Sequence, residues 1–425
     1  MVLGAGAAGL ACARSLVTAG RAVVILEARS RIGGRLLTRE GPGVPIELGG
    51  EFVHGTAPIS FELLRAANVA AIDVGQGSFS FGEGALREDE DPFEVAARTL
   101  SRARDLPADQ SVAAFLSTAG EREAQVTRML VEGFDAADPA RAGVLAIAHE
   151  WCDDQSGQTS RQFRPLGGYP PLLRTLRAAL EAARTMLLLN CVVHAVRRDR
   201  DAVEVWATDG AGAALQVRAR AAVVTFSVGV LQAGVPVFEP PLPAPTLEAL
   251  SLLAMGPVVK LGLVFQTAFW ETLADGRYRD TAFFHAGDGA FPTFWTQLPV
   301  RAPLLIAWAG GTKADALHAF DEPARVRAAL DDLRVLFGEA SDPHREFVAA
   351  YQHDWQRDPY ARGAYSYALV GGAQAREALT EPIDERIFLA GEATASAAES
   401  GTVAGALQSG TRAATQVLAR LGVNG

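Results

Sequence analysis

The sequence predicts an α/β fold that contains a Rossmann-type nucleotide-binding unit, and three observations near the N-terminus lead to this prediction. Met1–Leu3 is the end of an apolar strand, and Gly4–Gly9 has the spacing G-x-G-x-x-G. Leu10–Ala19 has the small and aliphatic residues of a helix that packs on a sheet. Ala22–Leu26 is a second apolar strand, and Glu27 follows it directly. This order of strand, glycine turn, helix, strand and carboxylate is that of a βαβ unit that binds a dinucleotide.

Each residue of the glycine turn has an expected task. Gly4 permits the tight turn, Gly6 lets the backbone approach a pyrophosphate, and Gly9 lets the helix pack closely on the strand. Near Ala8, the helix N-terminus offers unpaired N–H groups and a partial positive charge to phosphates. Glu27 can accept hydrogen bonds from a ribose diol. Plain strand-to-helix packing is the alternative for such a turn, and the pattern does not distinguish NAD from FAD.

A second glycine-rich loop follows the second strand. Residues 27–35 read Glu-Ala-Arg-Ser-Arg-Ile-Gly-Gly-Arg, and a solvated turn would not need a glycine pair at this place. The pattern resembles the flavin amine oxidase superfamily, in which a double-glycine arginine loop wraps FAD. The resemblance implies that Ala28, Arg29, Gly34 and Arg35 bind FAD.

The C-terminal region carries the second half of the resemblance. An apolar strand, Arg386–Ala390, runs into Gly-Glu-Ala-Thr at 391–394, and Ser400–Gly410 reads as a helix of small residues. This is similar to the closing signature of the superfamily, a Gly-Glu-x-Thr turn followed by a glycine-flanked helix. The resemblance makes Gly391, Glu392, Thr402 and Val403 flavin contacts. A close-packed Ala/Gly helix without a ligand is the alternative.

The central segment is expected to return to the nucleotide-binding unit. Leu187–Val196 reads as one strand, Val203–Ala207 as a second, and Val223–Leu231 as a strand and turn. In the superfamily a valine of this region packs on the adenine, and Val193 is the matching residue. Cys191 reads as a small buried apolar residue.

One lysine interrupts an otherwise apolar strand, Met255–Phe265. A buried ammonium group is unfavourable unless it has a partner or a task, so Lys260 is a candidate catalytic residue. A strand-end lysine that reaches water is the alternative. In the superfamily the matching lysine holds a water against flavin N5 and assists reoxidation by oxygen.

An aromatic segment, His353–Tyr367, precedes the C-terminal strand. It resembles the W-x-x-D-P-[aromatic]-A-R-G-x-Y-S-Y stretch of polyamine oxidases and histone demethylases, although an aromatic loop can also simply clamp two domains. The resemblance places Trp355 and Tyr360 near the flavin and Tyr365 against the substrate. Covalently flavinylated monoamine oxidases carry cysteine where Ala364 stands, so we expect non-covalent FAD. Thr402 replaces the second cage tyrosine of monoamine oxidases, which argues against a simple aryl-alkylamine specificity.

Another predicted edge of the pocket is Glu47–Gly55. It resembles the E-L-G-[AG]-x-[aromatic]-[VI]-H-G stretch of polyamine oxidases. The resemblance implies that Glu51 and Phe52 contact the flavin and that His54 lies near the amine. A lone histidine is more commonly a polar surface residue, which is the alternative for His54.

The chain of 425 residues is too long for one compact core. We expect a Rossmann-type FAD-binding domain interleaved with an α+β substrate-binding domain built on a mixed sheet. The FAD-binding domain is assigned to 1–72, 165–246 and 356–425, and the substrate-binding domain to 73–164 and 247–355. Amphipathic helices are expected at 92–103, 111–120, 122–133 and 325–337, and pocket-lining strands at 291–295 and 304–308.

Composition excludes several classes of protein. Lysine and arginine number 39 against 49 acidic residues, a net charge of −10, which disfavours binding to a nucleic-acid backbone. Three widely spaced cysteines give no disulfide framework or zinc site. No apolar run reaches the roughly 18 residues of a membrane span. We therefore expect a cytoplasmic protein without metal, nucleic-acid or membrane partners.

The predicted function is that of an FAD-dependent amine oxidase, an oxidoreductase acting on CH–NH or CH–NH2 groups. A primary or secondary amine would become an imine and then an aldehyde, and O2 would become H2O2. The alternatives are a flavin desaturase or oxidase of a hydrophobic substrate, similar to protoporphyrinogen oxidases or carotenoid desaturases, and a non-catalytic flavin-binding module. Candidate partners for the distal ammonium of a polyamine are Glu51, Glu83, Glu150, Asp153 and Asp154. Arg161 and Arg164 are the candidates for an amino-acid carboxylate, both expected to be solvated.

Overall fold

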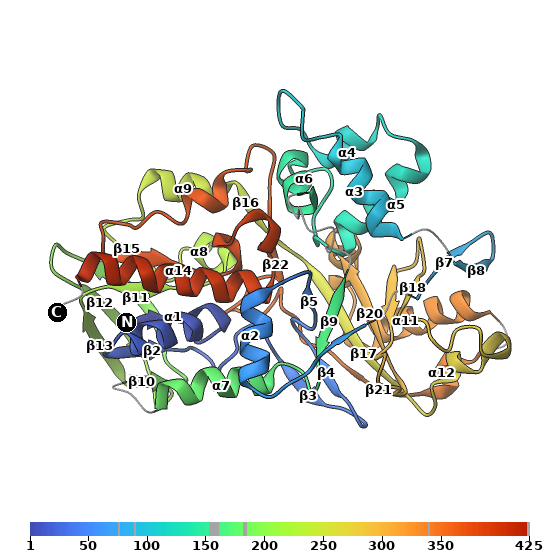
Figure 1. The fold of residues 1–425 in the computed structure, drawn as a ribbon, viewed down its shortest axis with the longest axis horizontal. Coiled ribbons are helices and arrows are strands. Elements are labelled where there is room, and N and C mark those ends of the chain that lie inside the picture. Colours follow the sequence, from blue (N-terminus) through green and yellow to red (C-terminus); the bar gives the residue numbers. More distant parts are fainter. Residues whose placement is uncertain (75–76, 89–90, 153–160, 182–184, 339–340, 423–425) are drawn as a thin grey trace.

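A computed structural model of the chain describes residues 1–74, 77–88, 91–152, 161–181, 185–338 and 341–422 (Figure 1). Two large sheets occupy opposite ends of the molecule, and a group of helices lies to one side of the second sheet (Figure 1). Both termini lie at the end that holds the first sheet (Figure 1). The α/β prediction is confirmed.

The first sheet is fully parallel and has the strand order β10-β2-β1-β14-β23. Its strands come from three distant parts of the chain: β1 (Val2–Leu3), β2 (Val23–Leu26), β10 (Thr185–Leu188), β14 (Ala222–Val224) and β23 (Ile387–Leu389). Parallel sheets are covered on both faces, which explains why β1, β2, β14 and β23 contain only apolar residues; the edge strand β10 differs, since it contains Thr185 and exposes Met186.

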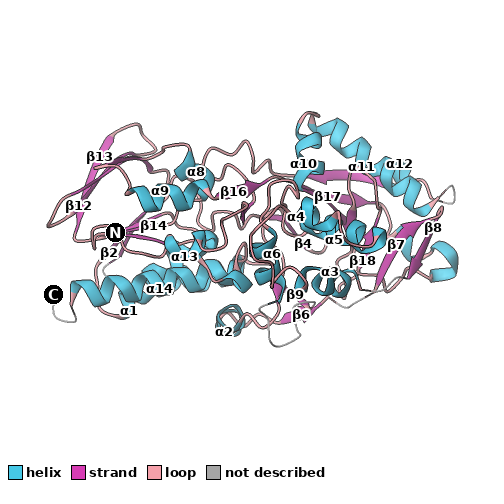
Figure 2. Ribbon diagram, turned by 90° about the horizontal axis from the view of Figure 1, so that it is seen from above, coloured by secondary structure: helices cyan, strands magenta, loops and turns pink. Residues whose placement is uncertain are grey.

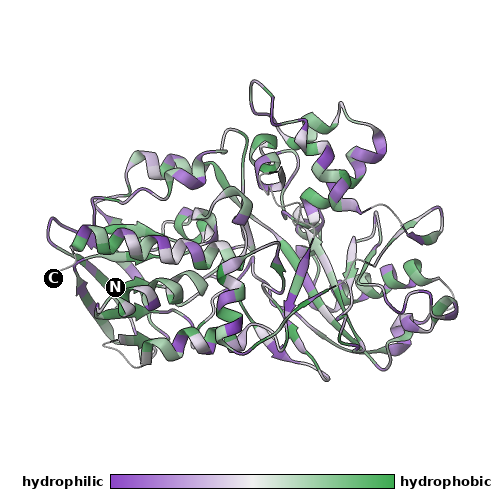
Figure 3. Cartoon of the chain, in the orientation of Figure 1, coloured by the Kyte–Doolittle hydropathy of each residue, from purple (hydrophilic) through white to green (hydrophobic). Residues whose placement is uncertain are grey.

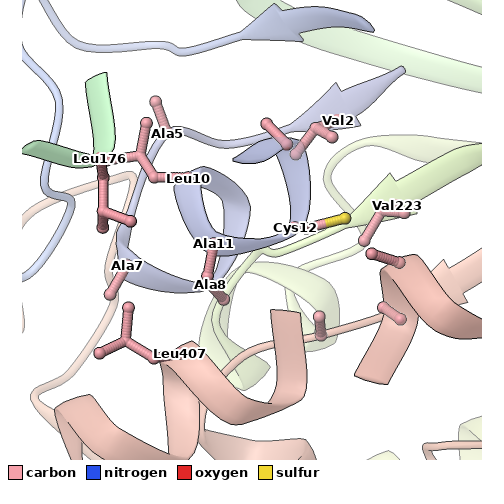
Figure 4. Close-up of a cluster of buried hydrophobic side chains, with 14 of the residues drawn as sticks. Val2, Ala5, Ala7, Ala8, Leu10, Ala11, Cys12, Leu176, Val223 and Leu407 are labelled. Carbon is pink, nitrogen blue, oxygen red and sulfur yellow. The ribbon is translucent and has the colours of Figure 1, made fainter. Parts of the chain in front are cut away.

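Alternate residues of these strands face two different cores. Val2, Ile25 and Val223 pack with the helices α1 (Ala7–Thr18), α7 (Pro170–Glu181) and α14 (Val403–Leu421), as Figure 4 shows for part of the cluster. Leu3 and Leu26 face the opposite core. That core is shared with a four-stranded sheet of order β13-β12-β11-β15. Its strands are β11 (Val192–Arg198), β12 (Val203–Thr208), β13 (Ala214–Ala219) and β15 (Val237–Glu239).

The predicted single strand Leu187–Val196 is wrong. The segment forms β10 and β11, which belong to two different sheets. Asn190, between them, has φ 54° and turns the chain, a left-handed conformation that asparagine tolerates better than most residues. The apolar residues on both sides of the turn hide it in the sequence, because each strand is buried separately.

The second large sheet is mixed, with the order β21-β17-β20-β19-β18-β7-β8. Its strands are β7 (Ser78–Gly82), β8 (Ala85–Glu88), β17 (Val258–Phe265), β18 (Phe283–His285), β19 (Thr293–Trp295), β20 (Leu304–Gly310) and β21 (Phe347–Tyr351). Val259 and Leu261 face a core covered by α10 (Gly311–His318) and α11 (Glu322–Phe337). Lys260 lies on the other face because side chains alternate along a strand. The predicted strands at 291–295 and 304–308 and the helix at 325–337 are therefore present.

Four helices form the insertion between β8 and β9: α3 (Pro92–Ser101), α4 (Val112–Leu116), α5 (Glu121–Gly133) and α6 (Val144–Cys152). They share one apolar core. Figure 3 colours much of α5 as hydrophilic, and the buried residues of this helix are Thr127, Leu130 and Val131. The helix α4 is shorter than the predicted 111–120; Ser111 caps its start by accepting a hydrogen bond from Ala114 N.

Smaller elements connect these units (Figure 2). They are β3 (Thr38–Glu40), β4 (Pro45–Glu47), β5 (Val53–His54), β6 (Ala71–Asp73), β9 (Gln162–Pro165), β16 (Leu253–Gly256), β22 (Tyr365–Ala368), α2 (Pro58–Ala66), α8 (Val228–Gln232), α9 (Ala244–Ser251), α12 (Pro343–Glu346) and α13 (Ala375–Ala378). Among the helices of the described residues, none has the length and apolar character required to cross a bilayer.

The strands follow the predicted chain organisation. Every strand of the parallel sheet falls within 1–72, 165–246 or 356–425, and every strand of the mixed sheet within 73–164 or 247–355. The domain boundaries themselves stay a prediction.

Candidate active site

One cavity of about 470 Å³ connects the glycine loops of the N-terminal βαβ unit with the strand β17. A volume of this size is typical of a small-molecule site. Its lining includes all predicted site residues except Gly9. These are Gly4, Gly6, Ala8, Glu27, Ala28, Arg29, Gly34, Arg35, Glu51, Phe52, His54, Val193, Lys260, Trp355, Tyr360, Tyr365, Gly391, Glu392, Thr402 and Val403. Residues more than 300 positions apart in the chain therefore meet around one space.

The two glycine loops touch each other at the nucleotide end of the cavity. A β-carbon on Gly34 would lie 3.2 Å from the Gly6 α-carbon, and Gly34 has φ +57°. Gly6 caps α1 without a side-chain hydrogen bond, which leaves first-turn N–H groups of the helix for a ligand. A β-carbon on Gly9 would lie 2.0 Å from the Gly4 carbonyl oxygen, so Gly9 permits close packing and does not line the cavity.

Glu27 is buried at the end of β2, and both of its oxygens accept backbone hydrogen bonds. The donors are Ala5 N, at 2.7 Å, and Arg29 N, at 2.9 Å. The Arg29 guanidinium forms an ion pair with Asp358 at 2.8 Å and lies 5.4 Å from the centre of the Tyr360 ring. The aromatic segment thus contacts the loop that follows β2, the second strand of the βαβ unit. The predicted contact of Glu27 with a ribose stays a prediction.

Arg35 and Glu392 join the N-terminal loop to the C-terminal turn. Arg35 Nη1 lies 2.9 Å from Glu392 Oε1 and donates to the Ala364 carbonyl at 2.8 Å. Burial raises the pKa of Glu392, but the charges of Arg35 and Arg376 and the hydrogen bonds from Arg35 and Ser366 together outweigh burial, so the pKa lies below its ordinary value. The following helix begins at Val403, three residues later than the predicted Ser400, because Thr402 caps it by accepting a hydrogen bond from Gly405 N at 2.9 Å.

Lys260 is buried on the cavity face of β17, and its partner is Glu51. Lys260 Nζ lies 2.7 Å from Glu51 Oε2 and donates to the Gly49 carbonyl at 3.1 Å. Both side chains are 3% exposed. The alternative of a strand-end lysine that reaches water is therefore wrong.

Tyr365 and His54 line the cavity together with the aromatic residues Phe52 and Phe134. Tyr365 donates to the Phe134 carbonyl at 2.6 Å, which fixes its ring. The His54 ring lies 5.3 Å from that of Phe134 and 6.0 Å from that of Phe52. Burial lowers the pKa of His54 to about 4, so the imidazole is neutral near pH 7. Its Nδ1 has no hydrogen-bond partner among the described residues.

The family of the chain follows from comparison with known proteins. The sequence model of the family described as flavin containing amine oxidoreductase matches residues 7–418. The chain belongs to this family. It is thus an FAD-dependent oxidoreductase that acts on amines, as predicted. The alternative of a desaturase-like enzyme is not favoured.

Similar sequences and structures agree with this family. Polyamine oxidase 4 of Oryza sativa subsp. japonica is 27% identical, over 99% of this chain and 88% of its own length. Lysine-specific histone demethylase 2 of Homo sapiens is also 27% identical, but the chain spans only 53% of it. Among solved structures, cyclohexylamine oxidase from Brevibacterium oxydans IH-35A has a TM-score of 0.83 at 22% identity, with 99% of this chain and 98% of that chain covered. Putrescine oxidase bound to putrescine has a TM-score of 0.80 at 21% identity, with 98% of each chain covered.

The residues of this flavin amine oxidase fit FAD. The phosphates of a dinucleotide need a stretch of backbone that carries no side chains. Gly6 and Gly34, which lie against each other in the cavity lining, provide such a stretch. At the other end, Gly50 lies against Leu36 and Val403, where a β-carbon would come within 3.1 Å of both. Cys12 is buried outside the cavity, and Cys191 lines its nucleotide end beside Val193.

Two carboxylates line the cavity: Asp135, which the sequence did not identify, and Glu150, which was one of the candidates for the distal ammonium of a polyamine. Asp135 lies two residues after the end of α5 and accepts a hydrogen bond from Trp151 Nε1 at 3.1 Å. Burial raises the pKa of Asp135 well above its ordinary value, and the charge of Glu150 raises it further. Burial also raises the pKa of Glu150, which lies 3.4 Å from Arg376. The signal in the sequence was Phe134-Asp135-Ala136-Ala137, a charge within an apolar stretch.

Other candidates for substrate binding have different surroundings. Arg164 was expected to be solvated, but it is only 12% exposed and pairs with Glu51 at 2.9 Å, because it lies between two sheets. Arg161 pairs with Asp73 at the surface. Glu83 is exposed in the β7–β8 turn, away from the cavity. Asp153 and Asp154 lie outside the described residues. Within the described chain, no group of three or more His, Cys, Asp or Glu residues could hold a metal ion.

Proposed function

We propose that the protein oxidises a small amine that carries a second positive charge, a diamine or a polyamine, with non-covalently bound FAD and with O2 as the electron acceptor. One observation carries this proposal. The cavity that joins the glycine loops to Lys260 is also lined by Tyr365 and by two carboxylates whose pKa values are raised, the buried Asp135 and the 13% exposed Glu150.

The overall reaction is a two-electron oxidation. Bound FAD supplies the electron acceptor, so that the amine loses two electrons and two protons to become an imine, and O2 takes them up as H2O2. Water then converts the imine to an aldehyde and ammonia, or to an aldehyde and a smaller amine. The chain itself selects, orients and desolvates the amine.

The reacting end of the substrate is assigned to Tyr365 and His54. Tyr365 is fixed by its hydrogen bond to the Phe134 carbonyl and presents its ring to the cavity. His54 is neutral near pH 7, and its Nδ1 can accept a hydrogen bond from an amine N–H. A neutral imidazole favours the neutral amine, which is the form that can be oxidised.

The second positive charge is assigned to Asp135. No described lysine or arginine forms an ion pair with it, and only 8% of the residue is exposed. Such a carboxylate is stabilised in its ionised form only if a cation enters the cavity. The ammonium group of a diamine supplies that cation.

Lys260 is assigned to the reoxidation of the flavin by O2, with its ammonium directed at flavin N5 through a water molecule. Its burial and its place in the cavity lining support this role. Ala364 lines the cavity where covalently flavinylated relatives carry a cysteine, which supports FAD that can dissociate.

The similar proteins support the substrate class without deciding it. Polyamine oxidases are among the relatives, and a putrescine oxidase is among the similar structures. Cyclohexylamine oxidase, which has the same fold, leaves a monoamine as the second candidate. The cytoplasmic location and the domain boundaries given above also remain proposals.

A peroxide assay tests the proposed substrate class. The purified protein, saturated with FAD, is supplied with putrescine, spermidine, butylamine, cyclohexylamine and several amino acids. We expect the highest kcat/KM for putrescine or spermidine. A preference for butylamine or cyclohexylamine supports the monoamine candidate, and oxidation of amino acids alone contradicts both.

A further inference from the structure

Lys260 and Glu51 both line the cavity and contact each other although they are 209 residues apart. Glu51 follows the glycine pair Gly49–Gly50 in the loop between β4 and β5. The 2.7 Å contact between Lys260 Nζ and Glu51 Oε2 is closed off from water, since each side chain is 3% exposed. The superfamily resemblance predicted a flavin contact for Glu51, and it did not predict a counter-ion for Lys260.

Glu51 is itself held by two further donors. Arg164 approaches Oε1 with Nε at 3.0 Å and Nη2 at 2.9 Å, and Trp295 Nε1 donates to the same oxygen at 3.1 Å. Arg164 also donates to the carbonyls of Leu298, at 2.8 Å, and Thr296, at 3.2 Å. One carboxylate oxygen is therefore taken by Arg164 and Trp295, and the other faces Lys260.

This arrangement defines the charge state of Glu51. Burial raises the pKa of the carboxyl group, but the charges of Lys260 and Arg164 outweigh burial and bring the pKa below its ordinary value. Glu51 is thus a carboxylate at neutral pH. Because two cations already share it, it is a poor receptor for the ammonium group of a substrate, which was one of its predicted roles.

The same contacts define the direction of the Lys260 ammonium. An ammonium group has three N–H donors. Glu51 takes one, the Gly49 carbonyl takes a second, and the Trp295 ring lies 5.4 Å from Nζ. Lys260 lines the cavity, so the third donor is available to an acceptor there.

We propose that Glu51 is a positioning residue: its carboxylate, anchored by Arg164 and Trp295, holds the Lys260 ammonium group and directs one of its N–H donors into the cavity. This inference rests on the proposed role of Lys260 in flavin reoxidation. A buried ammonium without a counter-ion is strongly disfavoured, so removal of the carboxylate favours the neutral amine as the pH rises.

The first test compares reoxidation in holoenzyme variants between about pH 6 and pH 9. The flavin is reduced anaerobically, mixed with O2 in a stopped-flow instrument, and followed by its absorbance. In the wild type we expect a rate that changes little with pH. Lys260→Met gives a slow rate at all pH values. For Glu51→Gln we expect one of two results. Either the reoxidation rate falls by about tenfold for each pH unit until it reaches the rate of Lys260→Met, or it equals the rate of Lys260→Met at every pH.

Two further variants separate charge from structure. Glu51→Asp keeps the carboxylate, so its pH profile stays flat even if its absolute rate is lower; a rate that falls with pH in this variant overturns the proposal. If Glu51→Gln does not fold, the pH profile of Glu51→Asp still tests the proposal. Asp332→Asn is the control, because Asp332 is also a carboxylate whose pKa burial raises, to about 6, but it accepts from Phe291 N outside the cavity. Its reoxidation should equal that of the wild type.

The second test needs no flavin. In the apoprotein, Glu51→Gln and Lys260→Met should each lower the melting temperature, and the double variant should lose less than the sum of the two losses, because residues in contact are not additive. Additive losses overturn the proposal that Glu51 holds Lys260.

The two tests distinguish this inference from the function on which it rests. If Lys260→Met slows reoxidation but Glu51→Gln matches the wild type at every pH, the positioning role is overturned and the role of Lys260 stands. If Lys260→Met reoxidises as fast as the wild type, the role of Lys260 is overturned, and the positioning role with it, even where the melting temperatures show coupling.

Discussion

Replacement of Asp135 by asparagine should remove the preference for diamines and leave the oxidation of monoamines almost unchanged. The change removes the charge at nearly constant size, and the amide oxygen can still accept from Trp151 Nε1. Asp135 is 8% exposed and lines the cavity, so its contact with an ammonium group would be poorly screened by water.

The size of the effect follows from the strength of such a contact. At 4 Å and an effective dielectric constant of 20, a pair of unit charges interacts by about 4 kcal/mol. Desolvation of the ammonium group reduces this, and hydrogen bonds to charged groups contribute about 1.5–3 kcal/mol net. We therefore expect kcat/KM for putrescine to fall by roughly 10- to 150-fold, since about 1.4 kcal/mol corresponds to a factor of ten.

The assay measures peroxide release with putrescine and with butylamine, which share a four-carbon chain and differ in the second amino group. With Asp135→Asn, kcat/KM for butylamine should change by less than about threefold. Asp332→Asn is the control: Asp332 is also a carboxylate with a pKa raised by burial, to about 6, but it accepts from Phe291 N outside the cavity. Equal losses for the two substrates, or no loss for putrescine, would refute the assignment of the second ammonium to Asp135.

Three further predictions concern the cofactor and stability. Trichloroacetic acid should release all the flavin into the supernatant, because Ala364 offers no thiol; flavin retained in the pellet contradicts non-covalent binding. Gly34→Ala should lower FAD affinity by at least about tenfold in a fluorescence titration, since its β-carbon would meet Gly6 at 3.2 Å in a left-handed backbone. Gly43→Ala, with φ +82° and no neighbour within 4 Å, should bind FAD as the wild type does. Burial raises the pKa of Glu47 from its ordinary value of 4.5 to about 7. The protonated side chain therefore contributes its full stabilisation of the fold below pH 4.5, and this contribution is lost as the pH rises through 7. Glu47→Gln should remove this dependence, at most about 3 kcal/mol, from urea unfolding of the apoprotein between pH 5 and pH 8, and an unchanged dependence assigns it to other groups.

The sequence predicted best the parts of the site that are made of backbone. Gly4, Gly6 and Gly34 lie where predicted because a close approach or a positive φ restricts a position to glycine, and such restrictions are local. Val193 also lines the cavity, as predicted, although the single strand predicted around it is in fact the two strands β10 and β11. That error arose because Asn190 is a single turn residue between two apolar stretches.

The contacts between side chains could not be predicted. Arg164 was expected to be solvated and is instead buried against Glu51, 113 residues away. Asp135 reaches the cavity because the chain turns after α5, and hydrophobic periodicity gives no information about that turn.

By itself, the sequence determined the nucleotide-binding unit, the loops that close on it from both ends of the chain, and the strand that carries Lys260. Each of these is specified by neighbouring residues through backbone geometry and burial. Which charges meet depends on how the distant segments fold together: Lys260 pairs with Glu51, Glu51 pairs with Arg164, and Asp135 pairs with no described cation. The energy of a buried charge depends on everything within a few ångströms, and those neighbours come from strands that are distant in the sequence.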